Sequence, residues 1–191
     1  MFDVAHSLLS GHTKKTLQGL LLSVLVGLLT ACDGNTELMK LTLDEDAQAI
    51  RTALNKGTQV DERNSFGWTA LMHAARQDQT EIMAILIDAG ADNNAQDDNG
   101  WTPLMRAASK GNVAATELLL QHKADIELAD NNGWTPLLSA CNRGRDKVLQ
   151  LLIANGADIN ATSKDGRTAL YLARNEGHDQ VLDILQKAGA K

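Results

Sequence analysis

The sequence predicts an all-α repeat solenoid, in which helix-turn-helix units with β-turn or hairpin tips stack on one another. Residues 99–104 and residues 132–137 both read NGWTPL. When the chain is shifted against itself by this offset of about 33 residues, columns of Trp, Thr and Leu superpose. Such self-similarity is typical of stacked repeats, each of which buries its apolar face against its neighbours.

The first segment, residues 1–31, is predicted to be a signal peptide. Lys14-Lys15 precede an apolar run of about 13 residues, which as a helix is shorter than a hydrocarbon core of about 30 Å. The run ends at Leu29-Thr30-Ala31-Cys32, which resembles the bacterial lipobox, where the chain is cut before a cysteine that then receives lipid. We expect lipidation of Cys32, with residues 32–34 as a short lipidated tether. The alternatives are an uncleaved signal anchor, or an ordinary signal peptide followed by a chance cysteine.

The rest of the chain, residues 35–191, is predicted to form about five repeat units. Their boundaries are 35–65 (an N-terminal cap repeat), 66–98, 99–131, 132–164 and 165–191 (a C-terminal cap repeat). A threonine before each first helix can cap its N-terminus, and Pro103 and Pro136 follow two of these threonines at the first helical position. The second helices carry apolar residues three and four apart, as one buried stripe requires. They end at a glycine column that favours positive φ, in which Lys123 is the exception.

The repeated motifs resemble those of the ankyrin-repeat family. That family's pattern, G-x-T-P-L-H-x-A-A followed by a helix and G-A-D-x-N-A, is met by GWTALMHAA with GADNNA, GWTPLMRAA with KADIEL and GWTPLLSAC with GADINA. The resemblance covers essentially all of the chain after the signal segment and implies a stack of β-turn and two-helix units. The histidine of the pattern is replaced in every copy, and the replacements are Met39, Met72, Met105, Leu138 and Tyr171. We expect apolar packing at these positions.

The sequence contains no constellation for catalysis, a cofactor or a metal. His73, His122 and His178 occupy non-equivalent places in three units, so stacking would keep them apart, and we interpret them as solvated or capping residues. The acidic loop ADNNAQDDNGW does not match the EF-hand, because Ala95 would stand first and Arg106 at the bidentate glutamate. We therefore expect no catalytic residue, no cofactor and no metal site.

Charge and cysteine content restrict the partners. The chain has a formal net charge of −6, and its sequence shows no basic stripe. Nucleic-acid affinity depends on neutralising phosphates, so we expect no nucleic-acid binding, and membrane attachment through the lipid alone. With Cys32 lipidated, Cys141 has no disulfide partner, and its place among small residues predicts a buried, inert thiol. We expect a monomer.

A row of tryptophans is the main candidate for a binding surface. In the family that the chain resembles, hairpin tips and first helices form a concave groove that binds proteins, and the residue between Gly and Thr is a contact position. That residue is Trp68, Trp101 and Trp134 in three successive units, and Arg167 in the last. Tryptophan is enriched among binding hot spots, so these residues are predicted to contact a protein partner. The alternative is that each indole packs across the base of its neighbouring hairpin and only stiffens the array.

Polar residues are predicted to complete this surface. His73, Arg106 and Ser139 are expected on the inner face of the first helices and are further partner-binding candidates. An acidic rim is expected at the tips, formed by Asp97, Asp98, Asp130 and Asp165. Such a rim would suit a partner with a basic or mixed patch.

These features predict a non-catalytic, lipid-anchored protein-binding module that faces the bacterial periplasm. By resemblance to enterobacterial lipoproteins, Asp33 favours the inner membrane, with the outer membrane as the alternative. Two roles fit: an immunity or inhibitor protein against a toxin delivered to the periplasm, or an accessory scaffold for a periplasmic enzyme such as a catalase. The competing hypotheses are an enzyme with an unrecognised site, and an array that faces the cytoplasm because the apolar run is never processed.

Overall fold

The computed structural model describes residues 34–191, so the predicted signal peptide and Cys32 lie outside the described residues. The described part of the chain contains ten α-helices: α2 (Glu37–Leu43), α3 (Ala47–Asn55), α4 (Ala70–Gln77), α5 (Thr80–Asp88), α6 (Pro103–Lys110), α7 (Val113–Gln121), α8 (Pro136–Asn142), α9 (Asp146–Ala154), α10 (Ala169–Asn175) and α11 (Asp179–Lys187). Within it β-pairing is limited to one isolated antiparallel bridge, between Thr162 and Thr168. None of these ten helices combines the length and the apolar character needed to cross a membrane.

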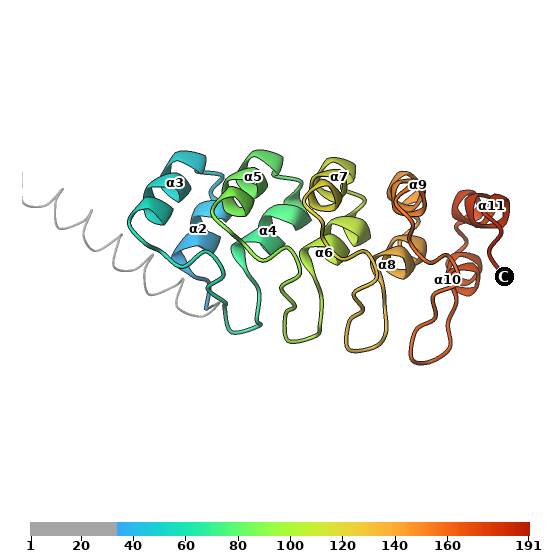
Figure 1. The fold of residues 1–191 in the computed structure, drawn as a ribbon. Helices are drawn as coiled ribbons and strands as arrows, with labels where there is room; N and C mark the ends of the chain where they lie inside the picture. The colour runs from blue at the N-terminus through green and yellow to red at the C-terminus, as the bar shows by residue number, and fades with distance from the viewer. Residues whose placement is uncertain (1–33) are drawn as a thin grey trace, which may run out of the picture. The chain divides into compact units, whose positions relative to one another are not determined.

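Residues 36–191 form one stack with its helices in two rows (Figure 1). Helices α2, α4, α6, α8 and α10 pack on one another in sequence and are called the inner row. Helices α3, α5, α7, α9 and α11 pack in the same order as the outer row. The loops that enter α4, α6, α8 and α10 project beyond the inner row as hairpin tips. The predicted all-α repeat solenoid is therefore confirmed.

Threonine caps the N-terminus of each inner-row helix, as the sequence predicts. The Thr102 hydroxyl accepts a hydrogen bond from the Met105 N–H at 3.2 Å, and Thr36, Thr69, Thr135 and Thr168 make the corresponding bond. This bond satisfies one of the N–H groups that a helix start leaves without an intrahelical partner. Pro103 and Pro136 occupy the first helical position, where a missing N–H costs nothing.

Apolar packing replaces the family's histidine in most units. Met39, Met72, Met105 and Leu138 are fully buried in the core, so the prediction is confirmed for these four. It is wrong for Tyr171, which is 53% exposed. Tyr171 lies on α10, and within the described part of the chain no later inner-row helix covers that side of α10.

One repeated position ties each unit to the unit before it. The side chain of the residue before each outer-row helix forms a hydrogen bond with a carbonyl at the end of the inner-row helix of the previous unit. The pairs are Gln79 with Thr42, Asn112 with Ala75, Arg145 with Ser109 and His178 with Asn142. The N···O distances lie between 2.9 and 3.1 Å. The last carbonyls of a helix lack intrahelical partners, so these side chains stabilise both the helix end and the stacking. His178 thus caps the end of α8, which is one of the two roles that the sequence left open for it.

Candidate functional site

Asp97 and Asp130 shape the hairpin tips from the inside. Oδ1 of Asp97 accepts hydrogen bonds from the backbone N–H groups two and four residues later, at 2.8 and 2.9 Å, and Asp130 does the same at equal distances. The two residues are 5% and 6% exposed, whereas Asp98 and Asp165 are exposed. The predicted acidic rim is therefore wrong at Asp97 and Asp130, because their carboxylates are needed to fold the turns.

These turns fix the position of the tryptophan that follows. Trp101 donates its N–H to Asp97, and its carbonyl accepts the Asp97 N–H at 3.0 Å. The preceding Gly100 has φ +82°, and a Cβ there would lie 2.7 Å from the backbone nitrogen of Asn131 in the next tip. Glycine thus allows the tips to approach closely, and the hairpins hold the base of each indole rigidly.

Arg106 lies between two of the tryptophans. Its guanidinium carbon is 3.8 Å from the ring centroid of Trp68 and 4.5 Å from that of Trp101. The same guanidinium pairs with Oδ2 of Asp97, whose side chain is fully buried, while that of Arg106 is 16% exposed. Burial lowers the pKa of Arg106 from its usual value, and the charge of Arg76 acts in the same direction, whereas Asp97 raises it. An arginine stays protonated in proteins, so this is a cation held by two indoles and one carboxylate.

The three indoles have different surroundings. Trp68 packs against the core of the first units and lies 4.8 Å from the His73 ring, centroid to centroid. Trp134 packs against the core of the later units. Trp101 is half-buried like the other two, and its indole contacts the Arg106 guanidinium. The interpretation of an indole that stiffens the array fits Trp68 and Trp134, which pack on the core.

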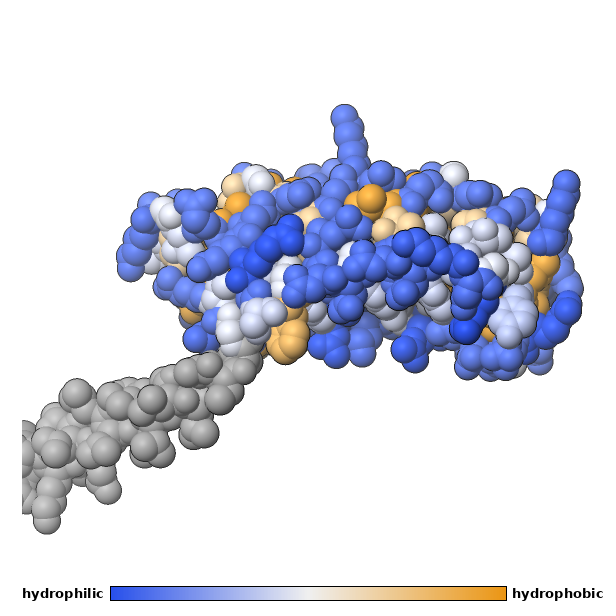
Figure 2. Space-filling view, turned by 90° about the horizontal axis from the view of Figure 1, so that it is seen from below, coloured by the Kyte–Doolittle hydropathy of each residue, from blue (hydrophilic) through white to orange (hydrophobic). Residues whose placement is uncertain are grey.

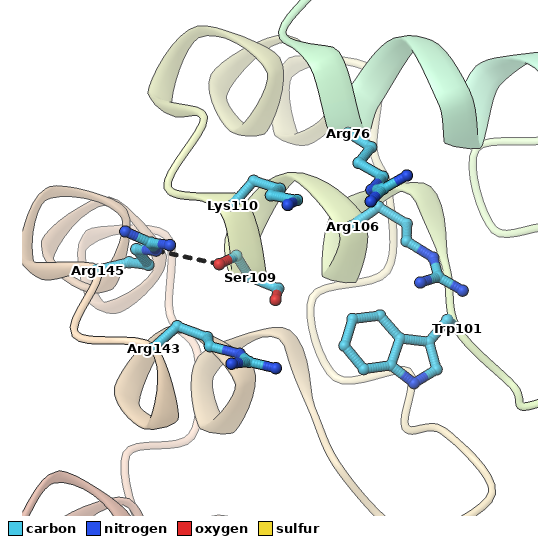
Figure 3. A pocket seen from close by; sticks show the side chains of 7 residues that line it. All are labelled: Arg76, Trp101, Arg106, Ser109, Lys110, Arg143 and Arg145. Carbon is cyan, nitrogen blue, oxygen red and sulfur yellow. Dashed lines mark hydrogen bonds between the residues drawn. The ribbon is translucent and has the colours of Figure 1, made fainter. Parts of the chain in front are cut away.

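A pocket of about 410 Å³ opens beside Trp101 and is called the basic pocket (Figure 3). Its lining residues are Arg76, Trp101, Arg106, Ser109, Lys110, Arg143 and Arg145. They come from α4, from α6 and the residue before its cap, and from the turn between α8 and α9, so three successive units contribute. No carboxylate is among the lining residues, and the pocket concentrates positive charge on a chain whose net charge is −6.

A second pocket, of about 290 Å³, adjoins the first and is called the tip pocket. It is lined by Trp101, Ser109, Asp130, Asn132, Trp134, Ser139, Asn142 and Arg143. Three of these residues, Trp101, Ser109 and Arg143, also line the basic pocket. The Ser139 hydroxyl is buried and has no hydrogen-bond partner among the residues that the structure describes. The two pockets form a continuous surface with Trp101 at their junction.

The comparison with family models identifies this architecture. The model described as Ankyrin repeats (3 copies) matches residues 3–97, 28–130, 89–163 and 125–191. The chain belongs to the ankyrin-repeat family. Ankyrin repeats generally mediate protein–protein interaction and are typically non-catalytic. A search of curated proteins found no match.

The ankyrin stack brings together most, but not all, of the predicted contact residues. Trp68, His73, Arg106 and Trp101 form one contiguous group, and Trp134 and Ser139 join Trp101 in the tip pocket. Arg167 lines neither pocket. It is exposed in the last ankyrin hairpin, where its Nε lies 2.7 Å from a carboxylate oxygen of Asp165.

The sequence analysis missed the basic lining of the ankyrin array. Arg76, Lys110, Arg143 and Arg145 were not predicted as site residues; the sequence was searched for a basic stripe, and these cations gather instead in one pocket. The negative net charge gave no indication of this group of cations, because the chain as a whole has more acidic than basic residues. One signal was present: at an offset of 33 residues Lys110 and Arg143 share a column, and Arg76 falls one position before it.

Two further observations concern chemistry in the ankyrin domain. Within residues 34–191, no three His, Cys, Asp or Glu side chains come together in a way that could hold a metal ion. Cys141 is buried and unpaired, and desolvation raises the pKa of its thiol to about 12. The thiol therefore stays protonated at neutral pH. The prediction that Cys141 is buried is confirmed.

Proposed function

We propose that this protein is a non-catalytic binding module that engages a protein partner through the inner-row surface around Trp101. The observation that carries the proposal is the position of Trp101, which lines both pockets and stands at their junction. An aromatic ring that is half-buried on a surface offers a partner a large contact area. Membership of the ankyrin-repeat family supports the same class of function.

The surroundings of Trp101 favour a contact that is already organised before binding. Its backbone is fixed by Asp97, and one side of its ring is covered by the Arg106 guanidinium, which Asp97 also holds. A side chain ordered in advance loses little conformational entropy when a partner binds, which is a common property of hot spots.

Binding can be tested by capture with the full chain carrying a C-terminal affinity tag, using an envelope extract of the native cell. Trp101→Ala should weaken retention of the partner by about 2 kcal/mol, or roughly thirtyfold. Tyr171→Ala is the matched control, because Tyr171 is an exposed aromatic residue that lines neither pocket. Equal capture by the parent and by Trp101→Ala would contradict the proposal.

The identity of the captured protein also separates the two roles considered from the sequence. A toxin directed at the periplasm would favour an immunity or inhibitor protein, and a periplasmic enzyme such as a catalase would favour an accessory scaffold.

We further propose that the module is anchored by lipid on Cys32 and faces the periplasm. The support is the motif Leu29-Thr30-Ala31-Cys32 at the end of the apolar run. Labelling cells with radioactive palmitate should mark the parent chain and a Cys141→Ser variant, but not Cys32→Ser. Labelling of Cys32→Ser to the level of the parent would contradict the lipid anchor. Digestion of the repeats by protease added to spheroplasts would support the periplasmic orientation, and full protection would contradict it.

A further inference from the structure

We infer that the basic pocket binds an acidic peptide segment of the partner, with Glu or Asp carboxylates placed among Arg76, Arg106, Lys110, Arg143 and Arg145. This inference rests on the proposed function and specifies the chemistry of the partner. It reverses the expectation, drawn from the sequence, of a basic or mixed patch on the partner.

The charges of the pocket are the first argument. Five of its seven lining residues are cationic. Among residues 34–191, no carboxylate forms an ion pair with Arg76, Lys110, Arg143 or Arg145, and only Arg106 has such a partner, in Asp97. Like charges that share one pocket repel one another, so an anion bound among them removes a repulsion and adds charge-assisted hydrogen bonds.

The second argument is that two of the guanidinium groups are held in place. Arg145 donates from Nε to the Ser109 carbonyl at 3.0 Å, which leaves its terminal nitrogens available, and its side chain lies across Gly111. Arg106 is held by Asp97 and the two indoles. Arg76, Lys110 and Arg143 are exposed and can adjust to a ligand. Figure 3 shows these side chains arranged around one space, with Trp101 on one side of it and Arg145 on the other. Planar guanidinium groups match the geometry of carboxylates.

The shape of the surface favours an extended peptide over a small anion. The basic pocket continues into the tip pocket, which is lined by Trp134 and the exposed Asn132. A peptide can place carboxylates in the first pocket and a neighbouring side chain or backbone group in the second. Seen from the side of the hairpin tips, the surface is mainly hydrophilic, and its apolar areas are small and separate (Figure 2). Charge and hydrogen bonding must therefore contribute much of the recognition.

A nucleic acid fits this surface less well than an acidic peptide. Its binding requires cations that follow a line of phosphates, whereas the cations here converge on one pocket of a chain with net charge −6. The exposed carboxylate of Asp98 and the buried carboxylate of Asp130 add negative charge at the tips.

The test uses the full chain and a fluorescein-labelled decapeptide of alternating Glu and Gly, with fluorescence anisotropy as the readout. The variant Lys110→Gln/Arg143→Gln removes two pocket charges at exposed positions. The matched control, Arg51→Gln/Lys56→Gln, makes the same change of net charge at exposed positions on and directly after α3 in the outer row. We expect the pocket variant to bind about tenfold more weakly and the control to differ by less than about twofold. The charge-conserving variant Lys110→Arg/Arg143→Lys should retain most of the binding, and thermal unfolding of each variant verifies the fold.

Several results would overturn the inference. The first is that the pocket variant and the control weaken Glu-Gly binding equally. The second is that the parent chain binds a Gln-Gly decapeptide as tightly as the Glu-Gly peptide. The third is that it binds a ten-residue oligothymidylate more tightly than the Glu-Gly peptide. If no Glu-Gly binding is detected while capture of a partner still depends on Trp101, the inference is overturned and the proposed function stands. If the Glu-Gly peptide binds but capture of a partner does not depend on Trp101, the proposed function is overturned, while the basic pocket is still a site for acidic peptides.

Discussion

The guanidinium carbon of Arg106 lies 3.8 Å from the ring centroid of Trp68, which belongs to the preceding unit. This contact crosses from one repeat to the next at the surface where both pockets open. Because the same guanidinium also contacts Trp101 and pairs with Asp97, the electrostatics of the site and the stacking of the repeats share one residue. Substitutions at this surface must therefore be assessed for stability and binding separately.

Removal of Arg106 should destabilise the fold. Arg106→Ala leaves the fully buried Asp97 carboxylate without its cation, and we expect the free energy of unfolding to fall by about 3 kcal/mol. Ser139 is the matched control because it occupies the same position one unit later, and Ser139→Ala removes a hydroxyl that has no partner within residues 34–191. Its effect should stay within about 0.5 kcal/mol. Urea unfolding of both variants measures this, and similar losses would contradict the role assigned to Arg106.

Replacement of Trp68 should lower the free energy of unfolding more than replacement of Trp101. Trp68→Ala removes an indole that packs on the core, on His73 and on Arg106, so a loss of about 3 kcal/mol is expected. Trp101→Ala removes an indole that contacts Arg106 and lines both pockets, and about 1 kcal/mol is expected from the lost contact. The measurement is again urea unfolding. A loss for Trp101→Ala as large as that for Trp68→Ala would make Trp101 part of the scaffold.

The fold was predictable because its main determinants are local and repeat in sequence. A Thr cap such as Thr102, a proline at the first helical position and small residues recur at one period, and each acts within its own unit. The linkage between units was harder to recognise, because Gln79, Asn112, Arg145 and His178 make the same contact with four different side chains. A column without a shared residue type leaves no pattern in one sequence.

The site was less predictable than the fold, for a physical reason. Asp97 and Asp130 look like surface residues of acidic loops, but their carboxylates turn inward to satisfy backbone N–H groups. The basic pocket combines unlike positions from three units, so it becomes visible only when the helices are placed side by side. The tryptophan column was found from sequence, but the position of Trp101 at the junction of two pockets was not.

Lys123 should be replaceable with a gain in stability. Its φ is +62°, in a column where glycine stands in the other complete units, and a side chain is disfavoured there. Lys123→Gly should raise the free energy of unfolding by about 1 kcal/mol. Gly90→Ala should have the opposite sign, because φ is +90° and a Cβ there meets no atom within 4 Å, so that only the backbone conformation is tested. A destabilising effect of Lys123→Gly would contradict this account.

Alkaline pH should destabilise the parent chain through Cys141. Burial raises the pKa of this thiol from 9.0 to about 12, so above pH 9 the unfolded chain loses a proton that the folded chain keeps. The contribution of the thiol to stability is thus complete below pH 9 and is lost as pH rises toward 12. Relative to Cys141→Ala, the free energy of unfolding should fall by about 1.4 kcal/mol per pH unit in this window. Parallel pH profiles for the two proteins, measured in reducing buffer, would show that the thiol is not held protonated.

Binding through the surface around Trp101 can be tested by photo-crosslinking in living cells, with p-benzoylphenylalanine introduced at one position at a time. Asn132 is exposed and lines the tip pocket with Trp101, whereas Gln150 is exposed on α9 of the outer row. We expect that the probe at position 132 captures a defined protein, that Trp101→Ala abolishes this adduct, and that the probe at position 150 does not form it. The same adduct from both positions, or an adduct at 132 that persists in Trp101→Ala, would contradict binding through the surface around Trp101.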